Sequence, residues 1–487
     1  MELSNLLREE SKWKKTENGA WAKSTTGSYL LDFFSMIGAA RTRREDEITH
    51  MFDMAFEEDP LGAMKCLFYT RDIRGGLGER RVFRILLEHI ANTYPEFIKV
   101  NLELIPEYGR WDDLYSLMPT PLEEDMCRLI RSQLDKDIQN MKDGKSISLL
   151  AKWLKKADSK NVETKMLGIY TAAKLGFTVY DYKRISNKLR RYLKVVEQTM
   201  SERRWGDIEY PSVPSKAMMN YRGAFYRHDE ERFKTYLDDV ASGKKKINAG
   251  TLYPYDIIEK ILYRNEDNKV LEIQWENLPN YVNDMNALVM ADVSGSMIGR
   301  PMATSIGLAL YFAERNVGAY HNLFMTFSHE PQVVEVKGKT ITDKVRHIAK
   351  ADWGMSTDLS KAFMKILKIA VENKCTQEEM PKALIIISDM EIDHCTDTNE
   401  RELFYDTMSK KFEEAGYCMP NVIFWNVNSR HNTFLADGKA KGVQLLSGSS
   451  VHTFRNLVDS FDKTPIETMY EVLNSERYEC IRVPENK

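Results

Sequence analysis

The chain has 487 residues, of which 43% are hydrophobic and 29% charged, so it is long enough for two or more domains and is not a largely disordered protein. Lys and Arg number 21 against 26 Asp and Glu over residues 1–150, 22 against 12 over 151–250, and 26 against 34 over 251–487. One basic segment therefore lies in mid-chain, which indicates a polyanionic partner.

The first ten residues lack a basic stretch followed by an apolar core, so they predict no secretory signal. No apolar run approaches the roughly 20 residues that cross a bilayer. The six cysteines contain no C-x-x-C pair, which argues against a zinc framework or a disulfide scaffold and indicates a reducing compartment. We therefore expect a cytoplasmic protein with no membrane segment.

Residues from about 25 to 275 show helical periodicity almost throughout, with short breaks. Pro60 predicts the start of a helix at its first turn. Other helices are predicted at 28–40, 46–56, 79–91, 97–105, 111–117, 122–141, 147–156, 161–175 and 181–199. We favour an irregular HEAT-like helical-repeat solenoid over a plain helical bundle, because the helices are too many for one simple bundle.

A glycine-rich turn flanked by arginines interrupts these helices at 71–81. It lacks the G-K-[ST] ending and the preceding strand of a nucleotide-binding loop. Its backbone amides and arginines are nevertheless candidates for holding a nucleic-acid phosphate. The arginines are Arg71, Arg74 and Arg80. The alternative is a structural turn whose arginines pair with Asp72 and Glu79.

For the stretch 108–114 we favour a structural role. Asp112 or Asp113 is expected to pair with Arg110 or to cap the next helix, and Trp111 to anchor that helix in the core.

Cations and aromatic residues such as Tyr182 and Tyr192 are mixed through the basic segment, a composition typical of a single-stranded RNA path. The alternative is an ordinary solvated charged face. The candidate RNA contacts are Lys155, Lys156, Lys183, Arg184, Lys188, Arg190, Arg191, Lys216, Lys244, Lys245 and Lys246.

A different architecture is predicted after a boundary between 275 and 284. The apolar stretch 287–291 predicts a buried parallel strand, and it runs into a turn that holds Asp292, Ser294 and Ser296. One carboxylate and two hydroxyls, spaced every second residue, can face a common hard cation such as Mg²⁺. Taken alone, the pattern is equally consistent with an ordinary polar turn.

Two later features favour the metal site. The polar loop 354–359 precedes an amphipathic helix, and the buried strand 382–389 ends in Asp389. The carboxyl ends of parallel strands are where open α/β sheets place their ligands. The remaining predicted strands are 322–328, 332–336, 421–427 and 442–446, and the predicted helices are 301–316, 341–350, 360–373 and 451–461. This alternation predicts a doubly wound sheet.

Residues from about 285 to 455 resemble a von Willebrand factor A domain with a metal-ion-dependent adhesion site (MIDAS). The resemblance rests on the D-x-S-x-S of residues 292–296, on Thr357 and on Asp389. It implies that Ser294, Ser296 and Thr357 ligate Mg²⁺ or another divalent cation, and that Asp292 and Asp389 hold ligating waters. It also implies an open coordination position that a partner's carboxylate fills.

One departure from the family pattern follows the last aspartate. The usual glycine is Met390 here, and Glu391 and Asp393 come next, so we expect a more acidic outer shell.

The order of domains resembles the Ro/TROVE ribonucleoprotein family and a related uncharacterised family of phages, bacteria and plants. The segments 71–74, 108–113 and 213–216 are similar to stretches of that related family. In the Ro family the helical repeats form a ring that binds small structured RNAs outside and single-stranded ends in its hole. We accordingly predict an RNA-binding helical domain at 1–280, an A domain at 281–462, and a C-terminal helix and tail at 463–487, with the helix packing back on the helical half.

The function predicted from the sequence is an RNA-binding scaffold whose A domain recruits a protein through Mg²⁺. The alternatives are a protein-binding scaffold without RNA and, as a third, a metal-dependent nuclease. We predict no enzyme, because G-x-S-x-G, H-E-x-x-H and P-loop motifs are absent and His394 has the setting of an ordinary loop histidine.

Overall fold

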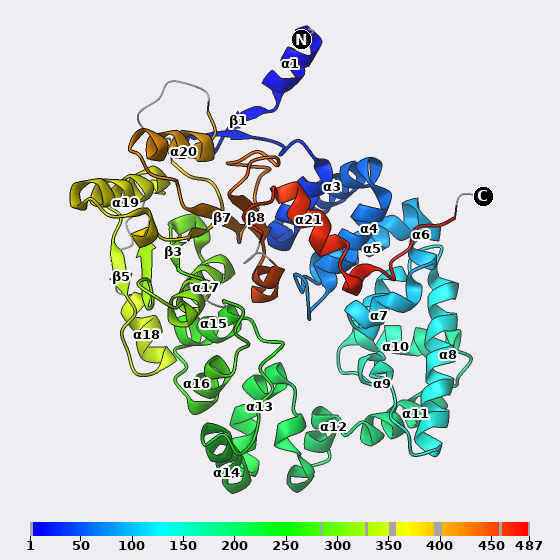
Figure 1. Cartoon of the computed structure of the whole chain (residues 1–487). Coiled ribbons are helices and arrows are strands. Elements are labelled where there is room, and N and C mark those ends of the chain that lie inside the picture. The colour runs from blue at the N-terminus through cyan, green and yellow to red at the C-terminus, as the bar shows by residue number, and fades with distance from the viewer. Residues whose placement is uncertain are drawn as a thin grey trace. The chain divides into compact units, whose positions relative to one another are not determined.

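The computed structural model describes residues 3–282, 285–326, 330–349, 357–393, 402–456 and 460–485 (Figure 1). The chain forms two compact units. The first, which contains the six-stranded sheet, is made of Met1–Val82 with Leu252–Glu479. The second, called the helical unit below, is made of Phe83–Thr251 with Cys480–Lys487. The predicted loop residues Gly354 to Ser356 and the histidine His394 lie outside the described residues.

The helices of the first unit largely follow the predicted periodicity. Asp59 caps α4 by accepting a hydrogen bond from the Gly62 amide (2.9 Å), and Pro60 occupies the first turn as predicted. The elements before the helical unit are α1 (Leu3–Ser11), β1 (Trp13–Lys15), β2 (Trp21–Lys23), α2 (Tyr29–Met36), η1 (Ile37–Thr42), α3 (Glu45–Glu58) and α4 (Pro60–Arg71), and those after it are α15 (Pro254–Arg264) and α16 (Lys269–Glu276).

The helical unit breaks more often than the periodicity predicted. The helix expected at 181–199 is two helices, because Lys194 adopts a left-handed conformation (φ 50°) between them. The elements of the helical unit are α5 (Arg81–Thr93), α6 (Pro95–Lys99), η2 (Leu102–Leu104), α7 (Ile105–Tyr108), η3 (Trp111–Leu117), α8 (Glu123–Lys142), α9 (Leu150–Trp153), α10 (Val162–Lys174), α11 (Val179–Tyr192), α12 (Val196–Ser201), η4 (Trp205–Asp207), η5 (Tyr210–Ser212), α13 (Ser215–His228) and α14 (Glu230–Ala241).

The predicted structural role of residues 108–114 is confirmed in two contacts. Arg110 Nε lies 2.9 Å from Asp112 Oδ1, and the Arg110 amide donates to Asp113 Oδ2 (2.9 Å) at the start of η3. Trp111 is only half-buried, and the ring that stacks on the Arg110 guanidinium is Trp153 (3.9 Å to the ring centroid).

A six-stranded sheet forms the core of the first unit, in the order β5-β4-β3-β6-β7-β8. All neighbouring strands pair in parallel except the edge strand β5, which is antiparallel to β4. The strands are β3 (Ala287–Ala291), β4 (Leu323–Thr326), β5 (Val333–Glu335), β6 (Ala383–Ser388), β7 (Asn421–Asn426) and β8 (Val443–Ser447). With the helical region before it, this sheet confirms the predicted fold class.

The helices around the sheet include one that the sequence pattern missed, α20 (Phe404–Glu414). The segment predicted as a helix at 451–461 is a 3₁₀ helix over Val451–Asn456 in its described part. The remaining elements are η6 (Gly295–Met297), α17 (Arg300–Arg315), α18 (Ile341–Ile348), α19 (Leu359–Asn373), η7 (Gln377–Glu379), η8 (Val451–Asn456), α21 (Pro465–Leu473) and η9 (Glu476–Tyr478).

The compact units do not follow the linear division at 280 and 462. Helix α2 contacts β8, and α21 contacts both α2 and α4, so the N-terminal helices belong to the unit that holds the sheet. The contact between α21 and the N-terminal helices confirms that the C-terminal helix packs back on them. At the adjoining contact between η1 and β8, the Gly38 amide donates to Ser447 Oγ (3.1 Å), and a Cβ at Gly38 would lie 2.8 Å from the Ser447 carbonyl oxygen.

Asp32 of α2 is a buried carboxylate in this packing. It accepts hydrogen bonds from the Thr26 amide (2.7 Å) and the Thr26 hydroxyl (2.6 Å). Burial nevertheless raises the pKa of Asp32 to about 6, and the nearby Glu58 adds to that rise.

This pKa predicts a pH dependence of stability. Because the folded-state pKa of Asp32 lies above the unfolded value, folding takes up a proton between about pH 4 and 6 and is favoured at low pH. Relative to Asp32→Asn, the wild type should gain about 2 kcal/mol of unfolding free energy between pH 7.5 and pH 4. Urea denaturation of both proteins across this range measures the difference, and a pH-independent difference contradicts the prediction.

Candidate metal centre at the ends of two parallel strands

Strand register brings the two predicted aspartates to one edge of the sheet. Ala291 pairs with Ile387, so Asp292 and Ser388 leave β3 and β6 side by side. The Asp292 amide donates to the Ile387 carbonyl (2.9 Å), and Ser388 Oγ donates to Asp292 Oδ2 (2.8 Å). Because β4 lies on one side of β3 and β6 on the other, this edge is the point where the strand order reverses, the usual ligand site of such sheets.

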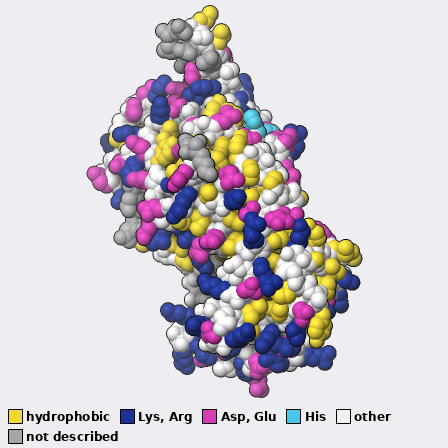
Figure 2. All heavy atoms as spheres, turned by 90° about the vertical axis from the view of Figure 1, so that its right-hand side faces the viewer, with side chains coloured by type: hydrophobic (Ala, Val, Ile, Leu, Met, Phe, Trp, Pro, Cys, Tyr) yellow, Lys and Arg dark blue, Asp and Glu magenta, His cyan; other side chains and the backbone are white. Residues whose placement is uncertain are grey.

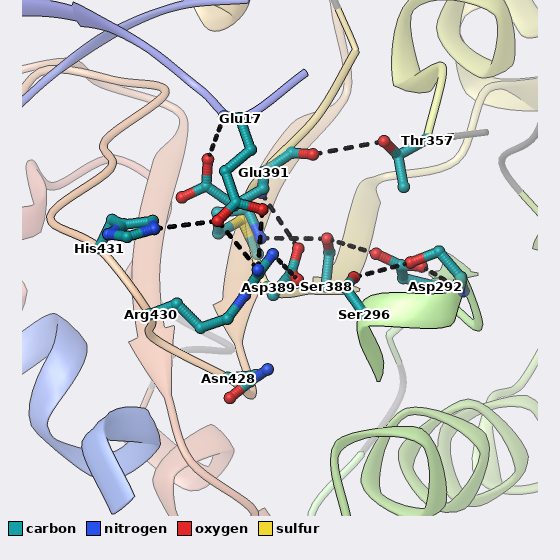
Figure 3. A network of polar contacts seen from close by, with 12 residues as sticks. Glu17, Asp292, Ser296, Thr357, Ser388, Asp389, Glu391, Asn428, Arg430 and His431 are labelled. Atoms are coloured by element: carbon teal, nitrogen blue, oxygen red, sulfur yellow. Dashed lines mark hydrogen bonds and ion pairs between the residues drawn. The ribbon is translucent and has the colours of Figure 1, made fainter. Parts of the chain in front are cut away.

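The turn after β3 gathers the predicted oxygen ligands. Asp292 Oδ1 accepts from the Ser294 amide (2.8 Å), and the hydroxyls of Ser294 and Ser296 lie 3.0 Å apart. Ser296 is exposed, whereas Asp292 and Ser294 are buried. The turn thus exposes the Ser296 hydroxyl and keeps the Asp292 carboxylate buried near it (Figure 3).

Burial makes the charge of Asp292 costly. It raises the pKa of Asp292 to about 6, and the charge of Asp389 adds to the effect. Within the described ranges no Lys or Arg forms an ion pair with Asp292. A cation in front of the turn would supply the missing positive charge.

Asp389, at the end of β6, is also buried, but it has a cationic partner. Arg430 Nη2 donates to Asp389 Oδ2 (2.8 Å), and the Glu391 amide donates to Asp389 Oδ1 (3.2 Å). Burial opposes the charge on the guanidinium, but Asp389 and then Glu17 outweigh it and raise the pKa of Arg430. The sequence analysis missed Arg430 and Glu17, because nothing in their local patterns connects them with the strand ends.

Thr357 lies at the same edge but faces the neighbouring loop. Its hydroxyl donates to Asp393 Oδ1 (2.8 Å) and accepts from Asn18 Nδ2 (2.9 Å), and its amide donates to Asp393 Oδ2 (2.9 Å). Asn18 also donates to the Glu391 carbonyl (2.7 Å), and the Thr357 hydroxyl lies 3.3 Å from the same carbonyl. Thr357 and Asp389 therefore belong to one polar network, in which Figure 3 shows the contact between Thr357 and Glu391. The structure therefore places all five predicted residues at one edge, with Thr357 at its margin.

At position 390, where the family pattern has glycine, this chain keeps the backbone conformation but not the residue. Met390 adopts φ 67°, the left-handed conformation that glycine takes readily and other residues take at a cost. Its amide donates to Ser388 Oγ (3.1 Å), and its side chain is buried. The turn therefore keeps a glycine-like backbone. The predicted acidic shell is present, since Glu391 is buried and accepts from Thr433 Oγ1 (2.7 Å) and the Glu17 amide (2.7 Å).

This donor set fits a hard divalent cation, because hydroxyl and carboxylate oxygens are the ligands that Mg²⁺ prefers. Over the described ranges, no group of three or more His, Cys, Asp and Glu side chains has the arrangement of a metal site. A site of the proposed kind is built differently, from two aspartates and three hydroxyls. The assignment of Asp292, Ser294, Ser296, Thr357 and Asp389 to a metal stays a prediction.

The structure also places the predicted RNA-binding residues. In the 71–81 turn Arg71 is buried, whereas Arg74 and Arg80 are exposed. The turn is organised by the fully buried Asp72, which accepts from the Arg74 amide (3.0 Å), from Arg477 Nη2 (2.6 Å) and from the Tyr478 hydroxyl (3.0 Å).

In the basic segment, Arg190 is buried, and its guanidinium donates to the carbonyls of Ala151 and Leu154 (2.8 Å each). Lys155 and Lys183 are half-buried. The other predicted contacts are exposed: Lys156, Arg184, Lys188, Arg191, Lys216, Lys244, Lys245 and Lys246. Several cations form surface ion pairs, among them Lys183 with Asp158 (3.2 Å) and Arg191 with Glu202 (2.7 Å).

Comparison with known proteins gives similarity without an assigned activity. Residues 286–480 match a domain of unknown function (DUF7788), and residues 16–131 and 171–288 match another (DUF2828). The chain is 29% identical over 504 aligned positions to an uncharacterized protein of Acanthamoeba polyphaga mimivirus, covering 94% of this chain and 86% of that protein. It is similar to the crystal structure of the Deinococcus radiodurans Ro (RSR) protein at 14% identity and a TM-score of 0.46, over 92% of this chain and 99% of that one.

Neither of these two family descriptions names TROVE, so the resemblance to that family remains a resemblance. Among the described helices, none has both the length and the apolar character that a membrane crossing requires.

If Mg²⁺ binds at the candidate metal centre, it should stabilise the folded protein against unfolding. A cation that binds only the folded chain adds about 2.7 kcal/mol at a hundredfold excess over its Kd, which raises the Tm by several degrees. Ser294→Ala with Ser296→Ala should abolish this increase, because it removes two oxygen ligands. Differential scanning calorimetry with and without MgCl2 measures it. Ser305→Ala, a change in buried α17, is the control that should keep the full increase.

Proposed function

We propose that the chain is a cytoplasmic RNA-binding scaffold, in which the helical unit binds RNA and the strand-end metal centre recruits a protein. The observation that carries the RNA part is the surface around α11. Tyr180 and Tyr192 are 72% and 39% exposed there, beside the exposed cations Arg184, Lys188 and Arg191. Exposed rings beside cations allow bases to stack while phosphates are neutralised.

Figure 2 shows this mixture on one face, where Lys and Arg side chains surround exposed hydrophobic ones at the height of α8, α10 and α11. The ion pairs on this surface do not oppose the proposal, because exposed pairs contribute little and a phosphate can replace the carboxylate. Residues 151–250 keep ten more cations than anions, counting 22 Lys and Arg against 12 Asp and Glu. We leave Arg71 and Arg190 out of the proposed contacts, since both are buried.

The metal part rests on the exposed hydroxyl of Ser296 near the buried Asp292, which forms no ion pair with a Lys or Arg of the described residues. A divalent ion held by hydroxyls and water-bridged carboxylates keeps an open position, which suits the carboxylate of a protein partner. This ion would act as a bridge between the chain and its partner.

Loss of the α11 cations should weaken RNA binding. Replacing Lys183, Arg184 and Lys188 by Gln should lower the affinity for single-stranded RNA and reduce the slope of log K against log salt by about 2, since each phosphate contact contributes about 0.7. Fluorescence anisotropy with a labelled single-stranded RNA at several salt concentrations measures both.

Tyr180→Ala should weaken RNA binding by about 1–3 kcal/mol with little change in the slope of log K against log salt, because it removes base stacking alone. The same anisotropy titrations measure both quantities.

The control for the loss of positive charge replaces Lys337, Lys339 and Lys368, three exposed lysines of the sheet-containing unit, and should leave RNA binding unchanged. Absence of binding by the wild type at low salt contradicts the RNA proposal. RNA cleaved by the wild type in Mg²⁺ or Mn²⁺ would instead favour the nuclease alternative.

A scaffold that binds only proteins is the second candidate. The exposed stripe of Val162, Met166 and Tyr170 on α10 favours it, because apolar residues at i, i+4 and i+8 form a continuous helix face of the kind that proteins bury at interfaces.

Affinity purification tests the recruitment of a protein through the metal centre, which both candidates share, whereas the anisotropy measurement decides between them because only the first binds RNA. A partner held by the metal centre should remain after nuclease treatment and be released by EDTA, and it should be absent with the Ser294→Ala, Ser296→Ala variant. A partner lost on nuclease treatment is held through RNA, and one kept in EDTA contradicts recruitment through the metal.

A further inference from the structure

The N-terminal hairpin lies against the rim of the metal centre. Strands β1 and β2 pair antiparallel, and the turn between them reaches the loop after β6. Thr16 Oγ1 donates to the Ile392 carbonyl (2.7 Å), and Gly19 forms an antiparallel bridge with Asp393. Farther along the hairpin, Lys23 and Phe434 exchange two backbone hydrogen bonds of 3.0 Å each. These residues are all in the first compact unit.

The tip of this hairpin is joined to Asp389 through Arg430. Glu17 Oε2 lies 2.7 Å from Arg430 Nη1, and Arg430 Nη2 lies 2.8 Å from Asp389 Oδ2 (Figure 3). His431 Nε2 lies 2.9 Å from Glu17 Oε1. The Arg430 guanidinium therefore forms ion pairs with two carboxylates, the buried Asp389 of the candidate metal centre and the more exposed Glu17 of the hairpin.

A second link runs through Asn18. Its Nδ2 donates to Thr357 Oγ1 and to the Glu391 carbonyl. The hairpin thus contacts two of the five predicted metal-centre residues, one directly through Asn18 and one through Arg430.

A divalent cation and Arg430 compete for the negative charge of Asp389. Both use the carboxylate of Asp389, the cation through a ligating water and Arg430 directly, and the two positive charges repel each other at short range. Arg430 Nε is buried and has no hydrogen-bond partner in the described part of the chain, so Asp389 and Glu17 supply the ion pairs that hold the guanidinium. When a cation takes Asp389, Glu17 is the carboxylate left for Arg430.

We propose that hairpin docking and cation binding are coupled, with Arg430 as the shared group. Cation binding displaces Arg430 from Asp389 onto Glu17, which tightens the hairpin against the rim. Conversely, the docked hairpin favours the cation by drawing Arg430 away. This coupling rests on the proposed metal centre, and linkage requires it to be equal in both directions. Any partner that displaces the N-terminal hairpin from the rim therefore lowers the cation affinity of the metal centre.

The affinity for Mn²⁺ tests the coupling in the full-length chain. Arg430→Gln should raise the affinity about tenfold, because it frees Asp389 and removes a repelling charge. Glu17→Gln should lower it severalfold, because Arg430 then stays on Asp389. Arg430→Lys keeps the charge and should stay near the wild type. Electron paramagnetic resonance of free Mn²⁺ during titration measures each dissociation constant.

Matched controls are available on the surface of the same unit. Arg44→Gln removes an exposed arginine that pairs with Asp46, and Glu57→Gln removes an exposed glutamate, so both change the net charge without touching the network. Both should bind Mn²⁺ as the wild type does. Circular dichroism confirms that each variant folds.

Hydrogen exchange gives the reciprocal readout. Mn²⁺ should slow amide exchange in the peptide covering residues 13–23 of the wild type, since Arg430 then holds Glu17 more firmly. In Arg430→Gln the cation should leave that exchange unchanged. A peptide from α8, in the helical unit, serves as the internal reference and should not respond.

The outcomes separate the two proposals. If the wild type takes up no Mn²⁺ at millimolar concentration, the metal centre and the coupling both fail, while RNA binding is unaffected. If the wild type, Glu17→Gln and Arg430→Gln bind Mn²⁺ equally, the coupling is overturned and the metal centre stands. Faster exchange of the hairpin in Mn²⁺ would also overturn it, because the sign would be reversed.

Discussion

The parallel pairing of β3 with β6 is the constraint on which the rest of the candidate site depends. Its register sets Asp292 beside Ser388 and puts Asp389 one residue farther along the same edge. A shift of one residue would turn every side chain of a strand to the other face of the sheet. Both strands are buried along their whole length, so the apolar packing that fixes their register also fixes the position of the carboxylates.

The cost of this arrangement is a concentration of acidic side chains at one edge. Asp292, Asp389 and Glu391 are all nearly inaccessible to solvent. In the described ranges, the hydrogen bonds to these carboxylates come from backbone amides, from hydroxyls and, at Asp389, from the Arg430 guanidinium. Buried anions held mainly by neutral donors favour an added cation, because each donor offsets only part of the desolvation cost. That imbalance is the reason why we propose that this edge binds a cation.

The helical unit shows a different use of charge. Its cations are spread over exposed helix faces, and many share short ion pairs with neighbouring acids. Such pairs are weak in water and easily exchanged for phosphates. Arg190 is the exception, since its two carbonyl partners and its burial give it a structural role. The basic composition of the segment therefore overstates the number of side chains that can meet RNA.

The sequence alone determined the features that depend on neighbours along the chain. Apolar periodicity and capping located most helices, and the D-x-S-x-S turn with the strand-end Asp389 indicated which residues meet at the edge of the sheet, although their role as metal ligands stays a prediction. Tertiary structure decided which distant segments meet: Glu17 pairs with Arg430 across more than 400 positions, and the N-terminal helices share a unit with the sheet. Such contacts leave no periodic signal, because they arise from the packing of whole elements, and a short polar hairpin such as β1–β2 carries little pattern of its own.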